Sequence, residues 1–186
     1  MANTTKPKLI SGGHKGAEAE FGRAAKRWGI AQSTLSFAGH AMEWPMSVRV
    51  LSAAELAEGD ISMQIVSKHM GRTYHEADLI RRVFQSLYHM VNEAYQLFAI
   101  GWIQADKTVK GGTGWGVELA KLFNRQTWVF DQERGSWFSW VDGQWQPGTP
   151  KIGRRSFAGT GTRNLSPTGR AAIEALFTES FGPAKE

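Results

Sequence analysis

Glycine residues gather at two places in this chain of 186 residues, and each place also holds side chains that could bind a phosphate group. The first loop, 11–16, offers the candidate ligand-binding residues Ser11, Gly12, Gly13, His14 and Lys15. Glycines let backbone N–H groups approach a phosphate closely, and the N-terminus of a following helix attracts negative charge. The loop lacks the Gly-Lys-Ser/Thr ending of a Walker A motif, so an ordinary strand-to-helix turn is the alternative.

The second loop, 110–116, carries the stronger signal, because four of the six residues at 111–116 are glycine. Its candidate ligand-binding residues are Gly111, Gly112, Thr113, Gly114 and Trp115. Glu118 follows in what we expect to be the first turn of a helix. That carboxylate either faces the ligand as an acid, base or ribose-binding group, or stabilises the helix dipole.

A third glycine-rich stretch, 157–163, ends in Arg163, which could bind an anion beside the first two loops; a flexible loop is the alternative.

The five histidines show no metal-ligand spacing, and the chain has no cysteine. Disulfides and thiolate metal sites are therefore excluded, and we expect neither a metal site nor a cofactor.

The segments around these loops alternate between strand and helix patterns. Strands are predicted at 8–11, 33–37, 96–103, 127–131 and 156–158. Helices are predicted at 17–28, from 52, from 60 or 62 to 71, at 76–95, 117–123 and 167–177. This order favours an α/β, Rossmann-like fold, a mostly parallel sheet with helices on both faces. Ligands of such sheets bind at the carboxyl ends of the strands, where both loops would lie.

An Asp-Gly pair at 142–143 between two short apolar runs predicts a β-hairpin over about 136–147, rich in tryptophan and appended to the core. Its apolar surface could be buried between subunits, so we expect a homodimer or a higher homo-oligomer. The length favours a single domain at 8–181, with a flexible N-terminus at 1–7 and a loose tail at 182–186.

The chain carries a formal charge of +5, and its basic residues are dispersed. A basic balance favours an anionic partner, and a nucleotide or phosphorylated small molecule explains it as well as nucleic acid does. No apolar run is long enough to span a membrane, and no secretory signal is seen, so we expect a cytoplasmic protein without membrane contact.

The motifs and their order resemble the SLOG superfamily over about 8–131. The matching stretches are Ser-Gly-Gly at 11–13, Gly-Ala-Glu at 16–18, Gly-Gly-Thr at 111–113, Val-Glu-Leu-Ala at 117–120 and Thr-Trp-Val-Phe-Asp at 127–131. The superfamily includes the LOG (lysine-decarboxylase-like) phosphoribohydrolases, DprA-type DNA-binding proteins and molybdenum-carrier proteins. The likeness to the carrier branch is greatest.

The resemblance implies that the loops bind a nucleotide or a nucleotide-derived phosphate ligand. In LOG enzymes a loop glutamate and an upstream arginine cleave the base–ribose bond of a nucleoside 5′-monophosphate, which assigns catalytic roles to Glu118, Arg81 and Arg82. Lys110 stands where that family has proline, and Thr113 and Gly114 are in reversed order. A phosphoribohydrolase-type N-glycosidase, a non-catalytic nucleotide-signal sensor or sponge, and a DprA-like DNA-binding protein therefore all stay open, with the last least favoured.

Overall fold

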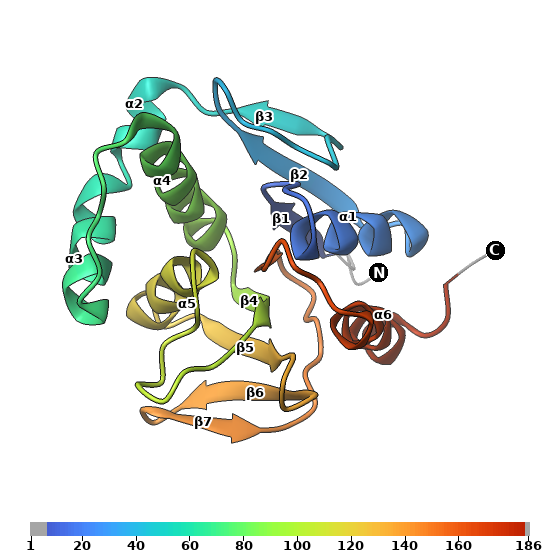
Figure 1. Ribbon diagram of the computed structural model, residues 1–186. Helices are drawn as coiled ribbons and strands as arrows, with labels where there is room; N and C mark the ends of the chain where they lie inside the picture. Colours follow the sequence, from blue (N-terminus) through green and yellow to red (C-terminus); the bar gives the residue numbers. More distant parts are fainter. Residues whose placement is uncertain (1–6, 185–186) are drawn as a thin grey trace.

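One eight-stranded sheet runs through the molecule, for which a computed structural model describes residues 7–184 (Figure 1). The strand order is β3-β2-β1-β8-β4-β5-β6-β7. The strands are β1 (Lys8–Ser11), β2 (Ala31–Ser36), β3 (Val48–Val50), β4 (Gln96–Gly101), β5 (Gln126–Asp131), β6 (Ser136–Val141), β7 (Gln144–Pro147) and β8 (Phe157–Gly161). Pairing is parallel from β3 to β5 and antiparallel from β5 to β7. The predicted Rossmann-like α/β fold is confirmed.

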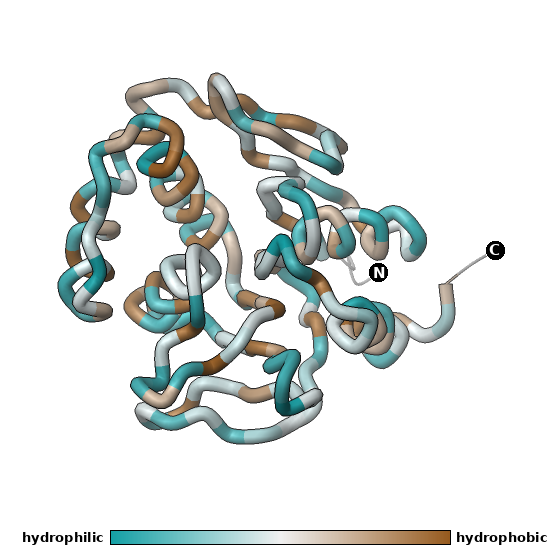
Figure 2. Tube along the Cα trace, viewed as in Figure 1, coloured by the Kyte–Doolittle hydropathy of each residue, from teal (hydrophilic) through white to brown (hydrophobic). Residues whose placement is uncertain are grey.

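Helices cover both faces of this sheet. They are α1 (Ala17–Arg27), α2 (Ala53–Ala57), α3 (Asp60–Met70), α4 (Asp78–Asn92), α5 (Thr113–Leu122) and α6 (Pro167–Phe181). Helices α1 and α6 lie side by side on one face, and α4 and α5 pack on the other with α3 outside them (Figure 1). Apolar and polar residues alternate along the helices in Figure 2, as expected of helices with one face on a sheet.

The central strands bury both of their faces because each side carries a helix layer. In β4, Leu97 and Ala99 belong to the core under α4 and α5, whereas Phe98 and Ile100 belong to the core under α1 and α6. This alternation follows from the two-residue period of a strand. It explains why the strand is an uninterrupted apolar run in the sequence.

Strand β8 lies near the centre of the sheet, between β1 and β4. Helix α1 packs directly on this strand. A Cβ atom on Gly159 would lie 2.6 Å from Cγ of Phe21 and 2.9 Å from Cδ1 of Leu9. The glycines of 157–161 are therefore needed for close helix–strand packing as well as for the loop that follows.

The predicted hairpin is confirmed, with Asp142 and Gly143 both at positive φ (48° and 73°), as a tight I′ turn requires. The hairpin extends the main sheet and is not merely appended to it, because β6 pairs with β5 along four residues.

The short edge strand β3 was not predicted. All three of its residues are exposed, so it has no pattern of buried apolar residues in the sequence.

Helix α5 begins at Thr113, four residues before the predicted start at 117. The glycines at 114 and 116 therefore belong to the helix and not to the loop.

Of the chain ends predicted to be flexible, residues 1–6 and 185–186 lie outside the described residues, and Pro7 is buried.

Candidate functional site

Three loops meet where the neighbouring parallel strands β1, β8 and β4 end. The chain leaves β1 toward β2 on one side, while β4 lies on the other side, so this is a point at which the strand order reverses. The loops and helix α4 enclose a cleft of about 550 Å³. Its lining comprises Gly12, His14, Glu18, His40, Ile80, Val83, Phe84, Ser86, Leu87, Met90, Trp102, Lys110, Gly111, Gly112, Thr113, Thr160, Gly161, Thr162, Arg163 and Asn164.

The two walls of the cleft differ in chemistry. Helix α4 contributes an apolar wall that includes Val83, Phe84, Leu87 and Met90. The opposite side includes glycines, hydroxyl groups, histidine rings and charged side chains, most of which come from the loops at the ends of the strands. A ligand with one apolar part and one strongly polar part matches this division.

The first and third loops are packed directly on each other. The Ala17 N–H donates to the carbonyl oxygen of Thr162 at 3.0 Å. A Cβ atom on Gly16, whose φ is +96°, would lie 2.5 Å from that same oxygen. The glycine is therefore required both by its conformation and by the close approach of the two loops.

Two exposed cations, Lys110 and Arg163, lie at the cleft and have no acidic partner among residues 7–184. The first turns of α1 and α5 also contribute lining residues, Glu18 and Thr113. A helix N-terminus carries a partial positive charge. Lys110, Arg163 and the N-terminus of α5 together make their part of the polar side attractive to an anion, whereas at α1 the Ala17 N–H already donates to Thr162 and the Glu18 carboxyl group lies in the first turn.

Glu18 is a buried carboxyl group in the lining, with only 8% of the residue exposed. Its Oε1 accepts a hydrogen bond from the Thr160 hydroxyl at 2.8 Å, and its Oε2 accepts one from the His14 N–H at 3.1 Å. Burial raises the pKa of Glu18, against the opposing effects of these two hydrogen bonds and of the His14 charge. Gly12 leaves room for the group, since a Cβ there would lie 2.6 Å from Oε2.

Sequence reasoning gave no role to Glu18, although the residue is part of the Gly-Ala-Glu motif at 16–18. The available signal was an acidic residue in the first turn after a glycine-rich loop, which also fits a helix-dipole partner. Only the strand order, which brings Thr160 beside it, identifies the group as part of the cleft.

His40 is a second lining residue that was not predicted. Its ring stacks on Phe37 at a centroid distance of 4.5 Å, and the His14 ring lies 6.1 Å from it. Its Nδ1 is 3.2 Å from Oγ of Ser36. Burial, followed by the His14 charge, lowers the pKa of His40, which favours a neutral ring in the cleft.

Of the predicted ligand-binding residues, six line the cleft: Gly12, His14, Gly111, Gly112, Thr113 and Arg163. Ser11 is buried below the first loop, where its Oγ accepts the Gly13 N–H. The Gly13 carbonyl accepts the N–H groups of Glu43 and Trp44. Lys15 is exposed and outside the lining.

Gly114 and Trp115 are buried and do not line the cleft. A Cβ on Gly114 would lie 2.1 Å from the Val109 carbonyl oxygen. Trp115 is 4% exposed and stacks on Phe84, with centroids 4.4 Å apart.

The three predicted catalytic residues are not brought to the cleft. Glu118 pairs with Lys121 at 2.6 Å, and Arg81 pairs with Asp60 at 3.0 Å. Arg82 donates to the Ala38 carbonyl oxygen at 2.9 Å. For Glu118 the physical reason is the earlier start of α5, which places the residue in the second turn and on another face of the helix.

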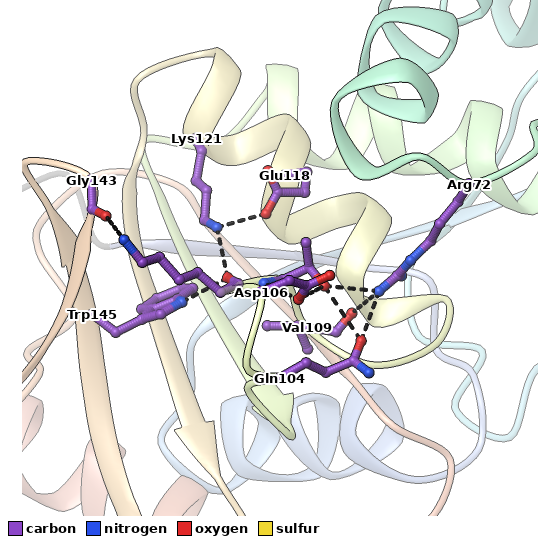
Figure 3. A network of polar contacts seen from close by, with 10 residues as sticks. Arg72, Gln104, Asp106, Val109, Glu118, Lys121, Gly143 and Trp145 are labelled. Carbon is purple, nitrogen blue, oxygen red and sulfur yellow. Dashed lines mark hydrogen bonds and ion pairs between the residues drawn. The ribbon is translucent and has the colours of Figure 1, made fainter.

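The loop before α5 is held from two sides, as Figure 3 shows. On one side the Arg72 guanidinium donates to the Val109 carbonyl oxygen at 3.0 Å and to the side chains of Gln104 and Thr108. It also donates to the Gly111 carbonyl oxygen at 3.0 Å. On the other side the Lys107 carbonyl accepts from Lys121 Nζ at 3.2 Å and from Trp145 Nε1 at 2.8 Å. These contacts fix the backbone that presents Gly111 to the cleft.

Comparison with known proteins shows the fold. No protein-family model matches the chain, and no curated protein matches it. A crystal structure of a protein named "putative molybdenum carrier protein", from Syntrophus aciditrophicus SB, is similar over 95% of both chains, with a TM-score of 0.54 and 15% sequence identity.

None of the described helices is long and apolar enough to cross a membrane. Among residues 7–184 there is also no group of three or more histidine, aspartate or glutamate side chains placed to hold a metal ion. The fold and the cleft geometry together define a Rossmann-like domain with a two-sided cleft at its strand ends.

Proposed function

We propose that the cleft binds a nucleotide or a nucleotide-derived phosphate ligand. The phosphate would lie on the polar side, near Gly111–Thr113, Lys110 and Arg163, and the apolar ring system would lie against α4. The observation that carries this proposal is that three strand-end loops meet at one cleft with an apolar wall and bring to it two cations, which have no acidic partner among the described residues. Binding without chemistry, as in a sensor or sponge, needs nothing beyond these groups.

Hydrolysis of an N-glycosidic bond is a second candidate, and Glu18 is the observation that favours it. With its raised pKa, the carboxyl group could hold a proton and donate it to the departing base. As the C–N bond breaks, water would add its oxygen to C1′ of the ribose and lose a proton to solvent or to Glu18. Glu118, Arg81 and Arg82 take no part in this scheme.

A ligand panel tests both candidates in one experiment. Nucleoside monophosphates, ADP-ribose, NAD and molybdate are added to the protein, and the melting temperature and the release of free base are followed together. Molybdate belongs in the panel because the solved protein of similar fold is named as a molybdenum carrier, and the anion-attracting side would admit an oxyanion.

A thermal shift without free base supports the binding protein, and free base whose release is lost in Glu18→Gln supports the hydrolase. Arg163→Gln should weaken nucleotide binding at least about tenfold, since a hydrogen bond to a charged group contributes roughly 1.5–3 kcal/mol. Glu118→Gln is the matched control and should bind as the unaltered protein does. Absence of any shift with every nucleotide would refute the proposal.

A labelled DNA duplex tests the least favoured alternative. Retention that falls steeply with salt would support a DNA-binding protein.

A further inference from the structure

A second pocket adjoins the cleft on the far side of the glycine-rich loop. It has a volume of about 530 Å³ and shares four lining residues with the cleft: Ile80, Phe84, Lys110 and Gly111. Its outer wall comes from the segment between α3 and α4, which contributes Thr73 and His75. The cleft and this pocket are therefore two compartments of one groove.

The second compartment has its own apolar floor and polar rim. Trp115 lies at its base, stacked on Phe84 with the ring planes 16° apart. Thr73 and His75 are exposed above them. No acidic residue lines this compartment, so it offers a surface for a ring-bearing group that is neutral or negatively charged.

Of the two cations that have no acidic partner among residues 7–184, Lys110 lies between the two compartments and not at one end. Lys110 lines both of them, as does Gly111 beside it. The Gly111 carbonyl is held by Arg72 at 3.0 Å, so the dividing loop is already fixed in position. An anionic group bound here would have space for a substituent on each side.

We propose that the ligand has two halves joined through phosphate: a dinucleotide, or a nucleoside diphosphate that carries a second ring-bearing group. This inference rests on the proposed function. The linking phosphates lie at Lys110 and the backbone of Gly111 and Gly112. One half occupies the cleft against α4, and the other lies over Trp115. Each compartment falls in the range of about 300–1,000 Å³ typical of small-molecule sites, so each has room for one half.

Calorimetric titration of the full chain with matched ligand pairs tests this inference: AMP against ADP-ribose and NAD, and FMN against FAD. For at least one pair, the two-part ligand should bind at least tenfold more tightly than the one-part ligand. Thr73→Trp, which fills the second compartment, should abolish this advantage and leave the affinity for the one-part ligand unchanged. Thr178→Trp, an exposed position on α6, is the matched control.

His75→Ala provides a second variant in case Thr73→Trp does not fold, and it should reduce the same advantage. Equal affinity for both members of every pair would overturn the two-part ligand and leave the proposed nucleotide site standing. An advantage that persists undiminished in both variants would also overturn it. If no member of any pair binds, the proposed function fails and the inference fails with it.

Discussion

Among single residues, Glu18 has the most specific consequences, because its carboxyl group is buried at the polar side of the cleft. Its hydrogen bonds to Thr160 and His14 compensate only in part for lost hydration, so burial dominates and raises the pKa. An acid with a raised pKa stabilises the fold fully below its ordinary pKa of 4.5, and this contribution is lost as the pH rises through the folded value.

Comparison with Glu18→Gln isolates this titration from that of other groups. The free energy of unfolding of the unaltered protein, minus that of the variant, should fall between pH 4.5 and pH 8. The fall should be about 1.4 kcal/mol for each unit by which the pKa is raised. Urea unfolding at several pH values measures it, and a His14→Ala background removes the neighbouring histidine. A difference that grows with pH would mean that hydrogen bonding outweighs burial.

Residue types alone predict that glycine-rich loops lie at the cleft but not which carboxylate lines it. The sequence favours Glu118 because it follows the loop that is richer in glycine, whereas in the structure Glu118 Oε1 lies 2.6 Å from Lys121 Nζ and Glu18 lines the cleft. When the start of a helix moves by one residue, the direction of the later side chains changes by about 100°. Side-chain direction therefore depends on a boundary that glycine-rich sequence defines poorly.

At the scale of elements, the start of α5 shows how packing overrides local preference. Glycine normally disfavours helix, but Gly114 permits close approach to the Val109 carbonyl. Gly114→Ala should lower the free energy of unfolding by at least about 2 kcal/mol, because backbone must move to admit the methyl group.

Gly116→Ala is the matched control in the same helix. Its added Cβ would lie 3.6 Å from Leu87, an ordinary contact, so the change should be neutral or stabilise by up to about 1 kcal/mol. Thermal and urea unfolding of both variants provide the measurement. Similar destabilisation by both substitutions would show that helix propensity, and not the contact with Val109, limits this segment.

The tryptophan-rich hairpin is tied to α5 by Lys121. The Lys121 ammonium lies 3.7 Å from the Trp140 ring centroid and 4.8 Å from that of Trp145. Lys121→Met keeps the apolar stem but removes the charge, and should cost about 1–2 kcal/mol of stability. A double-mutant cycle with Trp140→Leu should give a coupling energy of about 1 kcal/mol, whereas strict additivity would contradict the cation–π contact.

At the scale of the whole molecule, strand order was the feature that the sequence could not supply. The hydrophobic pattern identified β4 and β5 as short apolar runs, and it identified α1 and α4 by the helical spacing of their apolar residues. It carries no information about which strands pair, and β8 pairs with β1 across most of the chain. The cleft depends on that pairing, since Thr160 and Arg163 reach Glu18 and the first loop only through β8.

From the position of β8 we expect the C-terminal segment to be essential for cooperative folding. In the sheet, β1 and β4 both pair with β8 and not with each other. A chain ending at residue 155 loses β8 and α6, so its two half-sheets have no common strand, and it should show no cooperative urea transition by near-ultraviolet circular dichroism. Replacing 136–147 with a short linker removes β6 and β7 from the edge only, and should weaken the transition without abolishing it. A cooperative transition in the 1–155 chain would show that the helices alone hold the half-sheets together.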